Sequence, residues 1–187
     1  MFHSELNGEF VFETQRLVCR RWLSSDLNAI EDVYGDPVGA RWVGDGVPIS
    51  HADSQRWLSV TADNYRARGY GMYALVEKTT ADADFSPLGF CGLVHPDGQP
   101  ETETKYAMRK ERWGRGFASE ALLGLLNYAF SALDQQRLIA TVAAQNLASQ
   151  RVLVKCGFQF SSAHIEIDGE STFLYQILAA EQKPSKD

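Results

Sequence analysis

The first third of the chain changes from a strand pattern to two helix patterns. Between Gln15 and Trp22 apolar and polar residues alternate loosely, which is typical of a β-strand. Ser24-Ser25-Asp26 and Ser50 each precede an apolar stripe at helical spacing, so we expect them to act as helix N-caps. The predicted elements are a strand over 15–22, a helix ending at Gly35, a glycine-rich loop over 39–48 and a helix ending near Gly69. The residues expected to face inward are Leu27, Ile30, Val33, Tyr34, Trp57, Leu58, Thr61 and Tyr65.

The rest of the chain predicts further strands and two more helices. Ser119 to Leu133 carries leucines at helical spacing, and Asn146 can cap a helix that ends at Gly157. Asp168-Gly169, between the last two apolar runs, is a strong hairpin signal. The predicted strands are 71–78, 88–94, 103–109, 137–143, 158–167 and 171–178, and the tail 181–187 is expected to be disordered.

Composition bounds the class of protein. A length of 187 residues with 44% hydrophobic content fits one domain over 1–187, with an ordered core over about 13–178. Cys19, Cys91 and Cys156 show no disulfide framework or zinc-ligand pattern, which favours a reducing compartment. The chain has no basic leader and no run of the roughly 20 apolar residues that a membrane span requires. We therefore expect a cytoplasmic protein without a membrane partner.

The charge of the chain is acidic overall but uneven. A net charge of −6 argues against a nucleic-acid partner, because domains that bind a phosphate backbone usually carry a basic surplus. Between Lys105 and Arg115, however, five basic residues accompany one acid, Glu111. This run is either a solvated charged surface or the surround of an anion site.

Two glycines, Gly114 and Gly116, lie in this basic segment between a predicted strand and a predicted helix. Such a turn offers unpaired backbone amides and the positive end of a helix dipole, and glycine lets an anion approach the backbone. The segment lacks the lysine-bearing pattern of a P-loop and the three glycines of a dinucleotide fingerprint. It therefore predicts an anion-binding turn, with an ordinary tight turn as the alternative.

The segment from Trp113 to Leu122, WGRGFASEAL, resembles the acetyl-CoA pyrophosphate loop of the GNAT acetyltransferase superfamily, and most closely that of its RimJ/RimL-like branch of ribosomal-protein-alanine acetyltransferases. Three more stretches resemble that family in the right order. ETQRLVCRRWLSSD resembles its first strand and helix start, ETKYAMR its strand before the loop, and NLASQRVLVKCGF a later helix. The resemblance covers roughly residues 13 to 178.

The resemblance implies a mixed α/β fold of the GNAT type. Its central sheet is mostly antiparallel and twisted, with flanking helices and a splayed parallel strand pair that admits the pantetheine arm of acetyl-CoA; here the pair would be 103–109 and 137–143. Backbone groups near Met108 would pair with the pantetheine, and amides over 114–118 would hold the pyrophosphate. The residues implied to bind acetyl-CoA are Met108, Arg109, Trp113, Gly114, Arg115, Gly116, Phe117, Ala118, Ser119 and Asn146, with Arg112 as a further helper. For the arginines the alternative is solvated surface charge, and for Asn146 it is a plain helix cap.

The resemblance also implies two catalytic residues. Glu103 matches a family glutamate whose carboxylate would take the amine proton, directly or through water; the alternative is a substrate-binding or strand-edge acid. Many superfamily members have a tyrosine where this chain has Leu153, so Ser149 is expected to hydrogen-bond the departing sulfur, with an ordinary helix serine as the alternative. We expect Tyr106 to be a packing residue. Lys105 replaces the usual family glycine and argues against carrying over ribosomal-protein specificity directly.

The sequence therefore predicts an acetyl-CoA-dependent N-acetyltransferase that transfers an acetyl group to a primary amine by direct attack in a ternary complex. The expected acceptor is a protein or peptide N-terminus, with a small-molecule amine as the alternative; a non-catalytic acyl-CoA-binding regulatory domain is the competing class. His51, His95 and His164 lack metal-ligand spacing, so no metal is expected. A monomer and a homodimer are both compatible with the sequence.

Overall fold

The computed structural model of the protein describes residues 8–43, 46–78, 85–165 and 171–181. Within these residues, eight strands form one sheet in the order β1-β2-β3-β4-β5-β6-β8-β7. Of the neighbours described, β5 and β6 run parallel and the others antiparallel. The strands are β1 (Phe10–Glu13), β2 (Leu17–Arg20), β3 (Met72–Glu77), β4 (Gly89–Val94), β5 (Glu103–Met108), β6 (Arg137–Ala143), β7 (Gln159–Ile165) and β8 (Ser171–Leu178). The described part of the chain thus confirms the predicted α/β fold with its parallel strand pair.

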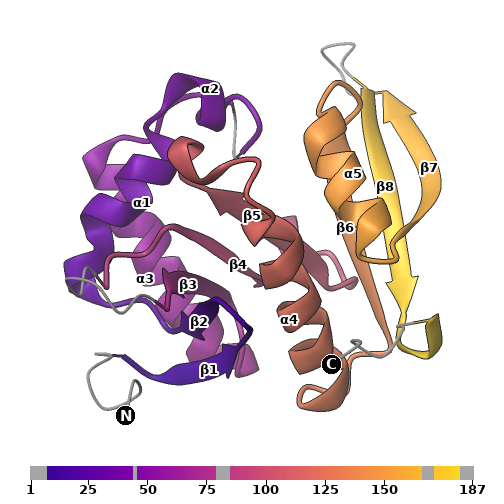
Figure 1. Ribbon diagram of the computed structural model, residues 1–187, viewed down its shortest axis with the longest axis horizontal. Helices are drawn as coiled ribbons and strands as arrows, with labels where there is room; N and C mark the ends of the chain where they lie inside the picture. Colours follow the sequence, from indigo (N-terminus) through magenta and orange to yellow (C-terminus); the bar gives the residue numbers. More distant parts are fainter. Residues whose placement is uncertain (1–7, 44–45, 79–84, 166–170, 182–187) are drawn as a thin grey trace.

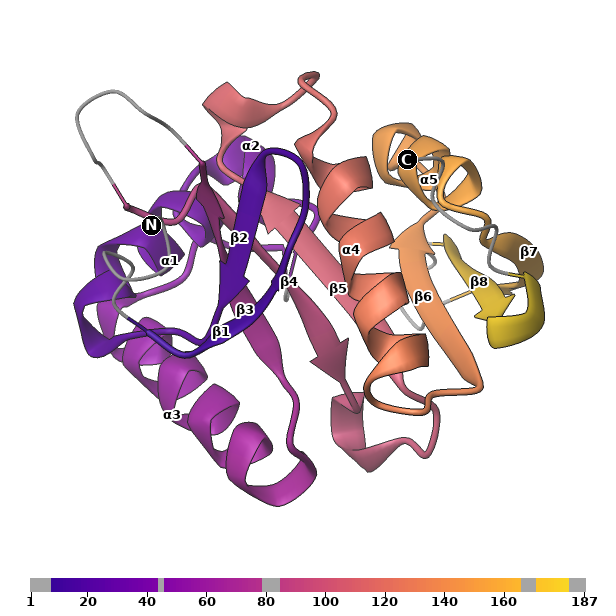
Figure 2. The same cartoon turned by 60° about the horizontal axis from the view of Figure 1, so that its bottom comes forward.

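Helices cover both faces of the sheet, as Figures 1 and 2 show. One hydrophobic cluster joins α1 and α3 to one face, and a larger cluster joins α4 and α5 to the other. The helices are α1 (Leu27–Tyr34), α2 (Pro37–Ala40), α3 (His51–Arg68), α4 (Phe117–Ser131) and α5 (Leu147–Lys155). None of the helices described is both long and apolar enough to cross a membrane.

The alternation of strand side chains explains these two clusters. In β3, Tyr73 and Leu75 pack with α4 and α5, whereas Met72 and Ala74 pack with α1 and α3. The apolar stripe of α4 is as predicted, and Leu125 is fully buried. Burying a leucine completely stabilises the fold by about 2 kcal/mol. The sheet core is therefore built on both sides of β3 and β4.

Three predicted helix ends are confirmed. The Asp53 amide donates to Ser50 Oγ at 3.2 Å at the start of α3, and Gly69 ends that helix with φ +79°. At the start of α5 the Ser149 amide donates to Asn146 Oδ1 at 3.1 Å. Local sequence therefore sets both ends of α3 and the start of α5.

The predicted N-cap of the first helix is wrong. Asp26 precedes α1 but makes no cap hydrogen bond to it. Its buried carboxylate instead receives the Arg20 guanidinium at 2.6 and 2.9 Å and the Leu23 amide at 2.8 Å. A buried arginine requires a charged partner, and this requirement outweighs the helix cap.

Other boundaries differ from prediction for local reasons. The predicted loop 39–48 begins inside α2, because Asp36 Oδ1 accepts the Val38 and Gly39 amides at 2.8 and 3.0 Å and Pro37 fits the first helical turn. The short edge strand β1 was not predicted. α4 begins at Phe117, ahead of the predicted Ser119. The Asp168-Gly169 turn and residues 182–187 of the tail lie outside the described residues.

Candidate active site

β5 and β6 separate almost as soon as they pair. Glu103 lies opposite Ile139, whose amide donates to the Thr102 carbonyl at 3.0 Å. Further along β6 the Thr141 amide donates to the Glu103 carboxylate, 3.1 Å from Oε1. The glutamate side chain therefore takes the place of a backbone hydrogen bond, and Figure 1 shows the strands diverging beyond it. We call this point the split.

The Glu103 carboxylate is buried at the split, with 2% of the residue exposed, and both of its oxygens accept hydrogen bonds. Oε1 also receives the Thr141 hydroxyl and the Lys105 ammonium, and Oε2 receives Gln99 Nε2 at 3.2 Å. Burial raises the pKa of the Glu103 carboxyl, but Lys105 and the Thr141 hydrogen bonds outweigh burial and hold this pKa below its usual value. Glu103 is therefore an ionised carboxylate at neutral pH.

Lys105 crosses the split as well. Its ammonium contacts Glu103 and donates to Thr141 Oγ1 at 2.9 Å. The two charges neutralise each other locally, so this residue, which departs from the family pattern, lies paired rather than as an isolated cation. Glu103, Lys105 and Thr141 together join β5 to β6.

Polar groups also lie on the opposite face of β5. Ala107 packs in the cluster with α1 and α3, whereas Tyr106 and Met108 pack in the cluster with α4 and α5. Because strand side chains alternate, Glu103 and Lys105 share the α1–α3 face and Tyr106 points to the α4–α5 face. The split therefore has a carboxylate on one face and a phenol on the other.

Ser149 meets that phenol from the first turn of α5. Tyr106 Oη lies 2.8 Å from Ser149 Oγ and 3.2 Å from the Ser149 carbonyl oxygen. The Asn146 cap holds the Ser149 amide, so Ser149 is fixed on two sides. Leu153, one turn further along α5, is 1% exposed and part of the core. Tyr106 packs as predicted, but the sequence reasoning missed its hydroxyl contact.

The backbone of β5 faces the split beyond Glu103. The Arg109 amide donates to the Leu88 carbonyl next to β4 at 2.8 Å. Because backbone groups alternate in direction along a strand, the even-numbered residues of β5 direct theirs toward β6. Tyr106 and Met108 are among them. The Met108 carbonyl accepts the Trp113 indole N–H at 2.8 Å. Trp113 thus fixes the end of the strand that was predicted to bind pantetheine.

The glycine turn has the predicted strand-to-helix geometry. Gly114 and Gly116 adopt φ +71° and +81°, and Gly116 precedes α4 without a side-chain cap. A Cβ on Gly114 would meet nothing within 4 Å, so the backbone conformation, rather than crowding within the chain, requires glycine here. Residues 114–116 are exposed and the first amides of α4 follow them. This is a suitable site for an anionic diphosphate.

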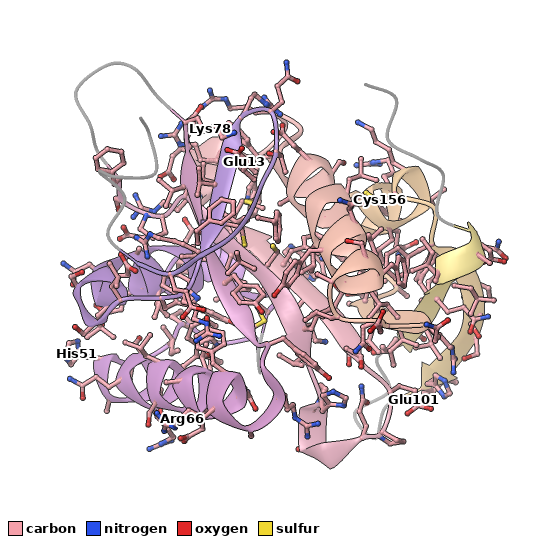
Figure 3. The ribbon with its side chains drawn as sticks, turned by 90° about the horizontal axis from the view of Figure 1, so that it is seen from below. Glu13, His51, Arg66, Lys78, Glu101 and Cys156 are labelled. Carbon is pink, nitrogen blue, oxygen red and sulfur yellow. The ribbon has the colours of Figure 1, made fainter. Side chains whose placement is uncertain are left out.

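Two predicted acetyl-CoA residues offer only backbone groups. Phe117 and Ser119 are 1% and 7% exposed, and both lie on the buried side of α4. Ala118 is partly buried beside them. The Ser119 carbonyl also accepts the Cys156 thiol at 3.5 Å, between α4 and α5 (Figure 3). Burial raises the pKa of that thiol to about 11, so Cys156 is protonated and is a packing residue.

The basic residues near the turn are paired with acids. Arg112 and Arg115 contact the Glu77 carboxylate at 2.6 and 3.7 Å. Arg109 contacts Asp32 of α1 at 2.8 Å. The pairs leave Arg115 half-exposed beside the glycines, whereas Arg109 points toward α1. Of the predicted arginines, Arg115 is therefore the better placed for a phosphate.

A brace behind the glycine turn was not predicted. Glu120 in the first turn of α4 accepts the Thr14 hydroxyl at 2.6 Å, the Arg16 amide at 2.7 Å and Arg16 Nε at 2.7 Å. The Arg16 guanidinium lies 4.3 Å from the centre of the Phe117 ring and donates to the Arg115 carbonyl at 3.1 Å. The sequence contained its signal in the ETQR and ASEA stretches, but it did not show that they meet.

The β1–β2 turn is anchored on its other side by Lys78. This ammonium donates to the Thr14 carbonyl at 2.7 Å and contacts the Glu13 carboxylate at 2.6 Å (Figure 3). The turn that carries Arg16 is thus fixed to β3 and to α4. The brace supports the glycine turn from behind.

Comparisons with known proteins show the family of the chain. The family model described as "Acetyltransferase (GNAT) domain" matches residues 16–159. "Uncharacterized N-acetyltransferase YoaA" of Bacillus subtilis strain 168 is 29% identical over 149 residues, which cover 80% of this chain and 82% of that protein. The chain belongs to the GNAT acetyltransferase family.

Solved structures show the same fold. A GNAT-family acetyltransferase from Bacillus anthracis superimposes with a TM-score of 0.77 at 21% identity, covering 92% of this chain and 99% of that one. RimL, a ribosomal L7/L12 alpha-N-protein acetyltransferase in complex with coenzyme A, superimposes with a TM-score of 0.75 at 16% identity, covering 91% and 98%. The relatives are named N-acetyltransferases, so the protein is an N-acetyltransferase, and the non-catalytic alternative is not supported. Membership of the RimJ/RimL-like branch stays a prediction.

Proposed function

We propose that the protein transfers the acetyl group of acetyl-CoA to a primary amine by direct attack, with both substrates bound at the split. The observation that carries this proposal is the placement of an ionised carboxylate and a hydroxyl pair on opposite faces of the sheet where β5 and β6 part. Glu103 lies on the α1–α3 face, and Ser149 with Tyr106 lies on the α4–α5 face. An amine and a leaving thiol need separate groups of these two kinds.

Acetyl-CoA fits the groups available along β5 and the glycine turn. The Tyr106 backbone and the Met108 amide face β6 at the split and suit the polar groups of a pantetheine arm, while the Met108 carbonyl is held by Trp113. The exposed turn over 114–116, with its positive φ angles, suits the pyrophosphate, and Arg115 adds a cation. Asn146 lies beside Ser149, where a polar group of the arm would pass.

On the amine side, Glu103 is the base. Both of its oxygens already accept hydrogen bonds, so the amine proton reaches it through a water molecule. The amine nitrogen bonds to the thioester carbonyl carbon, and its proton passes to the Glu103 carboxylate. Because the pKa of Glu103 is held low, the base form is present throughout the neutral range.

On the thiol side, Ser149 stabilises the leaving group. As the carbon–sulfur bond breaks, its electron pair goes to sulfur, and the Ser149 hydroxyl donates a hydrogen bond to that thiolate. Leu153 provides no alternative donor from the same helix face. No covalent enzyme intermediate forms, so both substrates must be bound together.

The proposed acceptor is a peptide N-terminal amine. Its support is the resemblance to ribosomal-protein acetyltransferases and the likeness in fold to RimL, whose name describes it as an alpha-N-protein acetyltransferase.

The test incubates the protein and acetyl-CoA with each of three acceptors and identifies the products by mass spectrometry. The acceptors are a peptide with a free N-terminus, the same peptide blocked at its N-terminus but containing lysine, and a small diamine. Acetylation of the free N-terminus alone is expected. Acetylation of the diamine alone would establish the small-molecule alternative, and no product from any acceptor would refute the function. The cytoplasmic location and the oligomeric state stay predictions.

A further inference from the structure

We propose that Tyr106 is a positioning residue for the leaving group: its phenol holds the Ser149 hydroxyl so that the serine proton faces the departing sulfur. This proposal rests on the proposed function of Ser149. The sequence predicts packing for Tyr106, and the structure adds a polar contact to that packing. The phenol crosses from β5, which lines the split, to the first turn of α5.

The contact between the two hydroxyls is short. Tyr106 Oη lies 2.8 Å from Ser149 Oγ, within the usual range for two hydroxyls. The Ser149 amide is held separately by Asn146 Oδ1 at 3.1 Å. The backbone of Ser149 is thus fixed by the helix cap, and its side chain is oriented by the phenol.

Two hydrogen-bond arrangements are compatible with these distances. In one, Ser149 donates to Tyr106 and the phenol donates to the Ser149 carbonyl oxygen at 3.2 Å, which leaves no free proton. In the other, the phenol donates to Ser149 Oγ and the serine proton is free to point into the split. Negative charge that develops on sulfur attracts that proton, so the leaving group favours the second arrangement.

The phenol is suited to donate and not to ionise. Burial raises the pKa of Tyr106, and the hydrogen bond to Ser149 lowers it by less, so the hydroxyl remains protonated at working pH. Tyr106 keeps its proton throughout and forms no bond to either substrate. Its effect is to orient and polarise the Ser149 hydroxyl.

This arrangement explains how the chain works without a helix tyrosine. Leu153 fills the position one turn beyond Ser149 and is buried in the core, so α5 alone supplies a serine. A serine hydroxyl in isolation has several rotamers and a freely rotating proton. The phenol from the neighbouring strand holds the serine oxygen and restricts its proton to the two arrangements above.

The test is a double-mutant cycle with Tyr106→Phe and Ser149→Ala, measured as kcat and as KM for acetyl-CoA. Tyr106→Phe keeps the ring and removes one oxygen. We expect kcat to fall about tenfold with KM changed by less than about twofold, because the ground state of bound acetyl-CoA does not need the contact. In the Ser149→Ala background the same change should alter kcat by less than about twofold.

Tyr175→Phe is the matched control, because it also removes a phenol that reaches α5, 3.5 Å from Gln150 Oε1, at a place outside the split. It should keep wild-type kcat. Thermal unfolding of each variant checks that the fold is intact. If Ser149→Ala keeps wild-type turnover, the serine assignment itself fails. If Ser149→Ala is slow while Tyr106→Phe is normal, or if Tyr106→Phe slows both backgrounds equally, only the role of Tyr106 is overturned.

Discussion

The Glu103 carboxylate and the Thr141 amide are joined by a hydrogen bond of 3.1 Å across the point where β5 and β6 part. A side chain here does what a strand carbonyl does elsewhere in the sheet. The bond ends the ladder at a fixed residue, and the strands beyond it are free to separate. The same carboxylate is the proposed base, so Glu103 has a structural role at the split and a proposed role in the reaction.

Glu103→Gln separates these two roles. The amide oxygen can still accept the Thr141 hydrogen bonds, so the fold and acetyl-CoA binding should be largely kept. The base is lost, and kcat should fall by about 10² or more, within the range typical of general-base removal. Initial rates and acetyl-CoA titration check this prediction. Wild-type kcat in this variant would remove Glu103 from the mechanism.

Lys105→Met should shift the acid side of the pH–rate profile. Lys105 favours the ionised form of Glu103, so removing it raises the pKa of that carboxyl. The acid limb of kcat/KM should therefore move to higher pH. Lys155→Met, which changes an exposed lysine of α5, is the control and should leave the limb in place. An unmoved limb for Lys105→Met would contradict the base assignment.

Gly116→Ala tests the glycine turn. An alanine at φ +81° costs about 1 kcal/mol of unfolding free energy, and it also brings a methyl group to the proposed pyrophosphate site. Gly69→Ala is the matched control. Gly69 has φ +79° at the C-terminal end of α3, and a Cβ added there would meet nothing within 4 Å. We expect similar losses of stability, but only Gly116→Ala should weaken acetyl-CoA binding, by about tenfold in calorimetric titration. Equal affinities would place the diphosphate elsewhere.

Glu120→Gln tests the brace through its pH dependence. Burial raises the pKa of Glu120, but bonds from Thr14 and Arg16 outweigh it and lower this pKa in the folded protein. A lowered folded pKa stabilises the protein above the unfolded value of about 4.3, and this stability is lost as the pH falls through the folded pKa. The variant should lose about 1–2 kcal/mol at pH 7, and the difference from wild type should shrink below about pH 4 in denaturant unfolding. Glu111→Gln is the control, because Glu111 is an exposed acid just before the glycine turn. This variant should leave the free energy of unfolding unchanged at both pH values.

The sequence could predict elements whose signals are local. The Asn146 and Ser50 caps, the leucine stripe of α4 and the two strands beside the split each follow from neighbouring residues. The Asp26 cap failed because Arg20 competes for the same carboxylate, and that competition depends on burial. Local patterns therefore placed the strands without showing where they part.

The contacts that organise the site join distant segments. Glu120 meets Arg16 across a separation of 104 residues, and Tyr106 meets Ser149 across 43. No periodicity or motif spacing encodes such pairings, because they arise only when the sheet brings β5, α4 and α5 together. The sequence around Tyr106 predicts packing alone, because its hydroxyl contact depends on the position of α5.

Release of free thiol from acetyl-CoA, followed with and without an amine acceptor, tests direct transfer at the split. The wild-type protein should release thiol in proportion to acetylated peptide. Release should depend on the presence of a peptide with a free N-terminus, and initial-rate plots for the two substrates should intersect, as a ternary complex requires. Acetyl-CoA binding without acceptor-dependent release, or an acetylated protein intermediate that forms before the acceptor is added, would contradict it.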